Sequence, residues 1–515
     1  MQDENPPVDC GVRRSASSLR PWIVKSLWIA IVLAACGHPH GFGAGPDAHG
    51  TGDDDGGGDD GGGGGDDDGG GGTHDGGSGN HDAGSGGHDA AVDAGLPGAC
   101  SSVPICAALS SGTNAAAMAV AVDSRDNVYV AGLAESDLTF AGHTLYQIGT
   151  RDAFIVSYTS TGAYRWARRF GDGAIESLVG AYAIAVDRDD NVFITGGIFG
   201  GADFGAGVIG GGGAFVASFD ANGTYRWARS DGGGTGSLAI AVAGTHVYAI
   251  GRFSGTMTFS PTISVTSAGD VDVDIAAYDT ATGTPLWARR EGGAYTDAEG
   301  GIVARPDWIA FTMGTAVVGN GEQLISFTAD GADRWATPLP PSIDLRGLAI
   351  DSAGSLFVAG LHQGGIDTIT GAPTSSGDNE FIHAYSSAGA STWSWTLPEV
   401  PAYSFSAVPR TPPAIDASGH LIIAGTYDGT LYAGGAGLGN GNETVFTAAF
   451  DAAGAPIASR SLDDHAPQSF EWTDGLAVDS TGQRWIVGQY FGTPNFGDGA
   501  LPFASEGGAL ILSVR

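Results

Sequence analysis

The segment AIAVDRDDNVFITG, residues 183–196, contains the pattern that decides the fold. Two apolar runs rich in β-branched and aromatic residues, which favour strands, flank the polar sequence Asp187–Asn191. Asp and Asn are typical of tight turns because their side chains bond to nearby backbone amides. A third run, AFVASF at 214–219, and a fourth, YRWAR at 225–229, follow a Gly-rich stretch. The segment therefore predicts four consecutive strands.

The same pattern recurs in seven copies between residue 100 and the end of the chain. Each copy has a Gly at the end of its second run, and successive glycines are separated by 46 to 65 residues. Repeats of this length with four short strands are typical of a β-propeller, in which each repeat forms one blade. The seven glycines are Gly132, Gly196, Gly251, Gly314, Gly360, Gly425 and Gly488. We predict an all-β fold, a seven-bladed β-propeller of four-stranded blades over residues 99–515.

The seventh copy has no fourth run, because the chain given ends at Arg515. A three-stranded blade would leave an exposed sheet edge, which natural proteins avoid. The apolar segment SSVPICAAL, residues 101–109, precedes the first copy at about the distance that separates a fourth run from the next repeat. We expect this segment to pair with the last blade and close the ring.

Tryptophan follows a turn glycine by four residues in the fourth run of five copies. These residues are Trp166, Trp227, Trp287, Trp335 and Trp393, and the sixth copy has Ala458 instead. A large side chain at one position of a repeat indicates packing between blades rather than a cofactor site.

The pattern AVDSRDNVYVAG, DAFIVSY and YRWARRFG, within residues 121–171, resembles the bacterial propeller repeat called the SBBP repeat. The resemblance covers nearly all of the chain from about residue 100, although Pro306 and Asp307 replace the usual turn in the fourth copy. It implies a seven-bladed propeller and an extracytoplasmic location, but no particular activity. Residues 276–287, AAYDTATGTPLW, also look like the tryptophan-docking repeat of quinoprotein propellers, which occurs too in a lipoprotein scaffold of outer-membrane protein assembly.

Four basic residues precede a short apolar run, SLWIAIVLAA at 26–35, which is typical of a secretory signal. The run is too short to span a membrane. It leads into Leu33-Ala34-Ala35-Cys36, which resembles the lipobox of bacterial lipoprotein signals. The resemblance implies cleavage of residues 1–35 and acylation of Cys36, and several acyl chains anchor a protein stably. An ordinary signal peptide or an uncleaved anchor is the alternative.

Gly37 rather than Asp follows the cysteine, which in the best-known sorting scheme favours the outer membrane. Residues 36–98 are mostly Gly and Asp, as in GDDDGGGDDGGGGGDDDGGGG at 52–72. Such a segment has too few apolar groups to fold and is expected to be a disordered tether with a span of roughly 40–45 Å. Acidic tethers of this kind resemble those on myxobacterial surface lipoproteins. We expect a lipid-anchored protein of the cell envelope, at the outer membrane or cell surface of a Gram-negative bacterium.

The formal net charge is −35, with 57 acidic and 22 basic residues. Nucleic acids need a basic surface, so they are excluded as partners. Acidic residues recur between the predicted blades: Asp172, Glu176, Asp231, Glu291, Asp297, Glu299, Glu399, Asp463, Asp464, Glu471 and Asp474. An acidic loop face would attract cations, basic proteins or glycans, and a merely solubilising acidic surface is the alternative.

The sequence contains no HExxH, GxSxG or P-loop motif. Its propeller histidines are scattered over different blades: His143, His246, His362, His383, His420 and His465. The turns Asp123–Asn127 and Asp187–Asn191 offer ligands for calcium but lack the full ligand set of an EF-hand loop, so we interpret them as turns. We predict no catalytic, cofactor-binding or metal-binding residue.

Of the four cysteines, Cys10 leaves with the signal and Cys36 carries lipid. Cys100 and Cys106 remain, and in an oxidising compartment they form a candidate disulfide that needs a bend near Pro104. The chain is interpreted as a monomeric binding or scaffold module with a protein or glycan ligand. A propeller enzyme, either acting on polysaccharide or of quinoprotein type, and an outer-membrane assembly scaffold are the alternatives.

Overall fold

The computed structural model describes residues 105–109, 114–315, 322–340, 344–362, 379–396, 411–431, 438–462, 470–496, 501 and 503–514. All of them belong to the second of two compact units, Ala90–Arg515. Across these ranges the chain forms β-strands and no α-helix. The described residues therefore contain no helix that could cross a membrane. The predicted signal peptide, Cys36, the tether and Cys100 lie outside the described residues.

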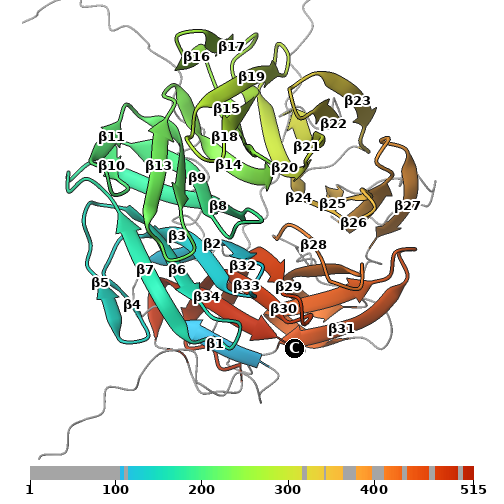
Figure 1. The fold of residues 1–515 in the computed structure, drawn as a ribbon. Helices are drawn as coiled ribbons and strands as arrows, with labels where there is room; N and C mark the ends of the chain where they lie inside the picture. The colour runs from blue at the N-terminus through green and yellow to red at the C-terminus, as the bar shows by residue number, and fades with distance from the viewer. Residues whose placement is uncertain are drawn as a thin grey trace, which may run out of the picture. The chain divides into compact units, whose positions relative to one another are not determined.

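Seven four-stranded sheets surround a common axis as the blades of a β-propeller (Figure 1). In blade 1, β2 (Ala115–Val122), β3 (Val128–Ala134), β6 (Asp152–Tyr158) and β7 (Tyr164–Phe170) pair antiparallel in that order. The first strand of each blade lies innermost, since first strands of adjacent blades contact one another around the ring. The predicted fold class is therefore confirmed, with one sequence repeat in each blade.

Blades 2 to 6 keep this strand order. Their strands are β8 (Leu178–Val186), β9 (Val192–Phe199), β12 (Gly213–Phe219) and β13 (Tyr225–Ser230) in blade 2; β14 (Gly234–Ala243), β15 (His246–Phe253), β18 (Asp272–Asp279) and β19 (Pro285–Glu291) in blade 3; β20 (Asp297–Arg305), β21 (Trp308–Thr315), β22 (Gln323–Thr328) and β23 (Asp333–Pro338) in blade 4; β24 (Asp344–Ile350), β25 (Leu356–His362), β26 (Asn379–Tyr385) and β27 (Ser391–Thr396) in blade 5; β28 (Ala414–Ile415), β29 (Leu421–Leu431), β30 (Leu438–Phe450) and β31 (Pro456–Leu462) in blade 6.

Blade 7 combines the two ends of the propeller. Its inner strands are β32 (Phe470–Val478), β33 (Arg484–Gly492) and β34 (Ala504–Val514), and its fourth strand is β1 (Ile105–Leu109). β1 pairs antiparallel with β34, from Ile105 opposite Val514 to Leu109 opposite Leu510. Backbone pairing between the start and the end of the domain thus supplies the strand that the seventh repeat lacks. Only the backbone of Cys106 is described, so the disulfide with Cys100 stays a prediction.

Blades 1 to 3 each carry a two-stranded hairpin between their second and third strands. These hairpins are β4 (Leu138–Phe140) with β5 (His143–Leu145), β10 (Gly201–Asp203) with β11 (Val208–Gly210), and β16 (Thr256–Ser260) with β17 (Ile263–Thr266). The stretch between the second and third strands of blade 3 therefore contains strand as well as loop. Strands of three to five residues interrupted by Gly have too little periodicity to be recognised.

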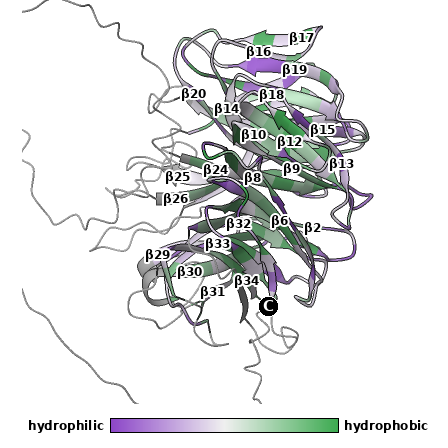
Figure 2. Ribbon diagram, turned by 90° about the vertical axis from the view of Figure 1, so that its left-hand side faces the viewer, coloured by the Kyte–Doolittle hydropathy of each residue, from purple (hydrophilic) through white to green (hydrophobic). Residues whose placement is uncertain are grey.

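The middle strands of the blades carry the core. Every residue of β3 and of β6 is buried, because neighbouring blades cover both faces of a blade. The outer strand β19 contains no buried residue. Figure 2 shows the hydrophobic residues concentrated along the strands within the ring.

The tryptophans join each blade to the next. The indole Nε1 of Trp166 donates a hydrogen bond of 3.0 Å to the Ala221 carbonyl in the outer turn of blade 2. Gly223 in that turn has a φ of +75°, and a Cβ there would lie 2.8 Å from the Trp166 ring. The same bond links Trp227, Trp287, Trp335 and Trp393 to the following blade. The five indoles therefore pack between blades, and the turn must hold glycine.

The Asp-rich turns use their carboxylates internally. Asp123 Oδ1 accepts hydrogen bonds from the backbone amides of Arg125 and Asn127 at 2.9 and 2.8 Å. Its Oδ2 accepts from Asn127 Nδ2 and from the Tyr129 hydroxyl, both at 2.8 Å. Burial opposes ionisation of Asp123, but these hydrogen bonds outweigh it and lower the pKa. Because both oxygens already accept two bonds, this carboxylate stabilises a turn.

Candidate functional site

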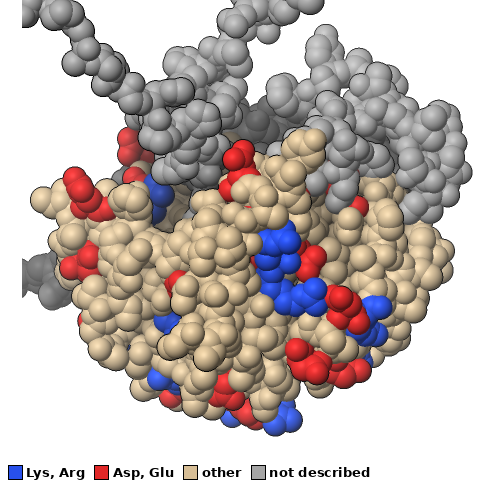
Figure 3. All heavy atoms as spheres, turned by 90° about the horizontal axis from the view of Figure 1, so that it is seen from above, with Lys and Arg blue, Asp and Glu red and all other residues tan. Residues whose placement is uncertain are grey.

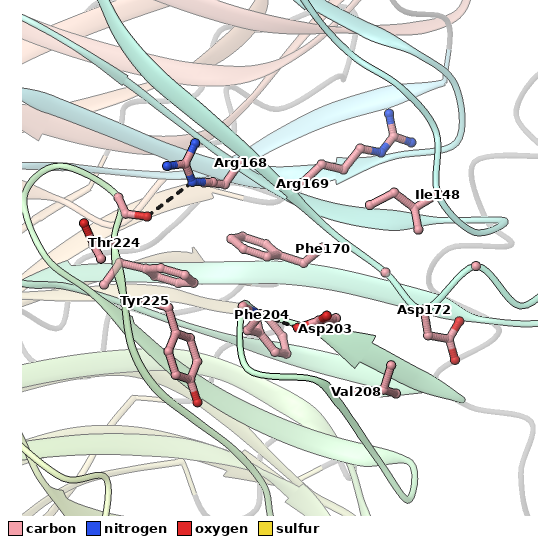
Figure 4. Close-up of a pocket in the computed structure, with 15 residues that line it drawn as sticks. Ile148, Arg168, Arg169, Phe170, Asp172, Asp203, Phe204, Val208, Thr224 and Tyr225 are labelled. Carbon is pink, nitrogen blue, oxygen red and sulfur yellow. Dashed lines mark hydrogen bonds between the residues drawn. The ribbon is translucent and has the colours of Figure 1, made fainter.

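A groove at the outer rim lies between blade 1 and blade 2 (Figure 4). It contains two adjoining cavities of about 700 and 340 Å³ that share Ile148 and Gly173 as lining residues. Both hollows are open to solvent, and their volumes fall within the range of about 300–1,000 Å³ that small-molecule pockets typically occupy. We call the two cavities together the rim groove.

Three elements that are distant in the sequence form the larger cavity. β7 contributes Arg168 and Phe170, the hairpin β10–β11 contributes Phe204 and Val208, and the start of β13 contributes Tyr225. The Phe170 ring lies 5.1 Å from both the Phe204 and the Phe219 ring. Alternation along the strands turns these rings inward, so buried aromatic residues support the floor of the groove.

The charged residues of the rim groove fall into two groups. Arg169 is structural, because its side chain is 3% exposed and its Nε lies 2.7 Å from the buried Asp152 carboxylate. Arg168 is exposed and donates through Nε to the Gly223 carbonyl at 3.3 Å. Asp172 and Asp203 each accept backbone amides of their own loops. Within the described ranges, none of Arg168, Asp172 and Asp203 forms an ion pair, so all three can serve a ligand.

Exposed apolar side chains surround the same groove. They are Ile148, Ile175 and Val208, and Ile175 is 89% exposed. Ile148 and Ile175 line the smaller cavity, and Val208 lines the larger one. Exposed hydrophobic residues gathered on one surface mark interaction sites more often than isolated ones do. The rim groove is therefore the strongest candidate for ligand binding among the described residues.

The acidic residues proposed from sequence do not form one exposed face. Asp172 lines the rim groove and Glu176 is exposed, whereas Asp231, Asp297 and Glu471 are buried. Glu399, Asp463 and Asp464 lie outside the described residues. On the edge of the ring shown in Figure 3, acidic and basic side chains are interspersed over a largely uncharged surface. The expectation of a uniformly acidic loop face was therefore wrong for the buried members.

A buried polar cluster lies where blades 3 and 4 meet, and two of its members, Asp231 and Glu299, were expected on the acidic loop face. Asp274 of β18 and Glu299 of β20 are both buried, and the Arg252 Nε lies 2.9 Å from Glu299 Oε2. The Tyr278 hydroxyl donates to Asp231 Oδ2 at 2.7 Å. Burial, and then the nearby negative charges of Glu299 and Asp231, raise the pKa of Asp274 to about 7. Burial likewise raises the pKa of Glu299 to about 7, against the opposing charge of Arg252.

A sequence signal for this cluster exists. The third runs of blades 1, 2, 5 and 6 have an aromatic residue opposite the glycine of the second run, as in Phe154 opposite Gly132 and Phe215 opposite Gly196. Asp274 stands opposite Gly251 in the same register. The replacement of an aromatic residue by a carboxylate within an otherwise regular strand marks an interior polar site.

The histidines remain separate from one another. His143 stacks on Tyr164 with ring centroids 4.4 Å apart, His420 Nδ1 lies 3.0 Å from Asp416 Oδ2, and His383 is buried in β26. His465 lies outside the described residues. Over the described ranges, no three His, Cys, Asp or Glu side chains are grouped to hold a metal ion.

No protein-family model and no curated protein matches the sequence. Among solved structures, a Bacteroides caccae protein of unknown function aligns at 12% identity and a TM-score of 0.25, covering 42% of this chain and 64% of that one. This chain therefore spans slightly less than two thirds of that protein.

Two dehydrogenases also align. A europium-containing methanol dehydrogenase matches at 12% identity and a TM-score of 0.37, covering 81% of this chain and 94% of that one. The quinohemoprotein alcohol dehydrogenase of Comamonas testosteroni matches at 12% identity and a TM-score of 0.38, covering 80% and 76%. At these scores the likeness supports no shared activity, and the class of protein, a seven-bladed β-propeller, rests on the strand pairing.

Proposed function

We propose that this chain is a lipid-anchored binding module of the cell envelope, of the SBBP-repeat kind, and that its ligand binds in the rim groove. The observation that carries the binding function is the groove itself, which combines cavities of about 700 and 340 Å³ with exposed apolar side chains and three charged groups without ion-pair partners. The lipobox ending at Cys36 and the Gly/Asp tether support an anchored domain held away from the membrane.

A binding function is favoured over hydrolysis by where the titratable carboxyls lie. General acid–base catalysis needs groups whose pKa is close to the working pH and that reach the substrate. Asp274 and Glu299 have such pKa values, but they are buried at blades 3 and 4 and do not line the rim groove. The groove offers shape, apolar contact and fixed charge, which are means of recognition.

The anchoring part of the proposal is tested with Cys36→Ala in the full chain, expressed in a Gram-negative host. We expect the protein to move from the membrane fraction to the soluble fraction, because no acyl chain can be attached. Cys10→Ala is the matched control, and it should leave the protein in the membrane fraction. Membrane retention of Cys36→Ala equal to that of the unaltered chain would rule out anchoring through Cys36.

A further inference from the structure

We infer that the rim groove binds an extended peptide segment of a partner protein, carrying two bulky apolar side chains and at least one basic residue. This inference rests on the proposed function and specifies its partner class. The arguments come from the shape of the groove, the chemistry of its lining and the sign of its charges.

The shape of the groove favours an extended chain. The two cavities adjoin across Ile148 and Gly173 and have unequal volumes, about 700 and 340 Å³. Peptides bound in extended conformation place alternate side chains in neighbouring pockets. One bulky side chain fits the cavity floored by Phe170 and Phe204, and a second fits the cavity beside Ile175.

The lining suits a peptide that carries both apolar and charged side chains. Ile148, Ile175 and Val208 are aliphatic and exposed. These three side chains suit apolar groups of a ligand, whereas Arg168, Asp172 and Asp203 of the larger cavity can bond to its polar groups. A bilayer surface does not enter a concave cavity. The carboxylates of Asp172 and Asp203 also repel the anionic lipids that attract peripheral proteins.

The charges favour a basic residue in the bound segment. Asp172 and Asp203 line the larger cavity, and no described arginine pairs with either of them. A lysine or arginine of the partner can reach these carboxylates, and a backbone carbonyl of the partner can accept from Arg168 beside them. The electrostatic complement of the groove is therefore a cationic, apolar peptide.

The experiment uses the full chain with Cys36→Ala as a soluble protein, panned against a phage-displayed library of random twelve-residue peptides. We expect enriched peptides with two bulky apolar residues and a Lys or Arg. Synthetic fluorescent copies of the enriched peptides are then titrated against variants. Ile148→Asp with Val208→Asp should weaken binding at least about tenfold, because both cavities lose an apolar contact and gain a hydrated carboxylate in its place.

Two further variants sharpen the test. Ile457→Asp on β31 is the matched control, since Ile457 is 49% exposed and Ile148 is 43% exposed, and it should leave binding unchanged. Asp203→Asn keeps the Oδ1 acceptor for the amides of Gly205 and Gly207 but removes the charge. It should weaken binding severalfold and reduce the dependence of binding on salt.

Several outcomes would overturn the inference. Equal binding by the Ile148→Asp, Val208→Asp protein would remove the groove as the site. Groove-dependent binding on a glycan array, or to vesicles of phosphatidylethanolamine and phosphatidylglycerol, with no peptide enriched would overturn the peptide class while keeping the binding function. If no probe of any class binds in a groove-dependent way, the binding function fails as well, whereas membrane release of Cys36→Ala reports on anchoring alone.

Discussion

Blade 1 and blade 3 share a strand order and a hairpin insert but differ at one interior position. In blade 1, Phe154 faces Gly132, and its ring would lie 2.7 Å from a Cβ at that glycine. In blade 3, Asp274 takes the corresponding position and shares the interior with Glu299. The repeat therefore preserves the backbone of a blade while the polarity of its interior changes completely.

The difference has an energetic consequence. The interior around Phe154 is apolar, with the Phe140 ring 5.5 Å away, so its stability does not depend on ionisation. The interior around Asp274 is stable when the carboxyls hold their protons, because an ionised carboxylate away from water is costly. Backbone pairing gives both blades the same strand arrangement. The interior side chains determine whether the stability of a blade depends on pH.

The largest effect is expected from placing the residue of blade 3 in blade 1. Phe154→Asp puts a carboxylate into an apolar interior without a charged partner, and we expect a loss of at least about 4 kcal/mol in the free energy of unfolding or failure to fold. Phe154→Leu is the control, because Leu510 occupies the same register in blade 7, opposite Gly488. It should cost only about 1 kcal/mol. Urea unfolding measures both, and similar losses would contradict the comparison.

An intermediate effect is expected from removing the indoles that join the two blades to their neighbours. Trp166 is buried at 9% exposure, so Trp166→Ala should cost about 3–5 kcal/mol. Trp287 of blade 3 makes the same 3.0 Å bond but is only half-buried, so Trp287→Ala should cost clearly less. Thermal unfolding of the two variants side by side measures the difference. An equal shift in the unfolding midpoint would show that the hydrogen bond, rather than burial of the indole, contributes most of the stability between adjacent blades.

A third effect is expected on the pH dependence of stability. The pKa of Asp274 is raised to about 7, so the native state keeps a proton that the unfolded state releases near pH 4. The resulting stability is complete below about pH 4 and is lost as the pH rises towards 7, by up to about 1.4 kcal/mol per pH unit. Asp274→Asn should flatten this decline, as measured by unfolding between pH 4 and 8.

Asp203→Asn, which changes an exposed carboxyl, serves as the control for Asp274→Asn and should leave the decline in place. Glu299 contributes a decline of the same sign, since burial also raises its pKa to about 7. The double variant with Glu299→Gln should therefore be flatter still. A pH dependence that is the same in Asp274→Asn and in the unaltered protein would contradict the interior placement of these carboxyls.

The sequence by itself determined the repeat, the strands and the need for a closing strand. These properties follow from local patterns: alternating apolar runs, Asp and Gly turns, and a tryptophan at a fixed distance from a turn glycine. The seventh copy lacks a fourth strand, and β1 fills that place by pairing with β34. This pairing was predictable because proteins in general avoid an unpaired sheet edge. A local pattern is sufficient for these features since each repeat folds against its immediate neighbours.

Only the tertiary structure decided the rim groove and the burial of the acidic residues. The groove joins Arg168 of one blade to Val208 and Tyr225 of the next, through a hairpin too short to recognise in the sequence. Asp172 and Glu299 both follow outer strands in the chain, yet one lies at the surface and the other inside the ring. Residue type and spacing can be read from the sequence, whereas the exposure of a side chain depends on which neighbouring blade covers it.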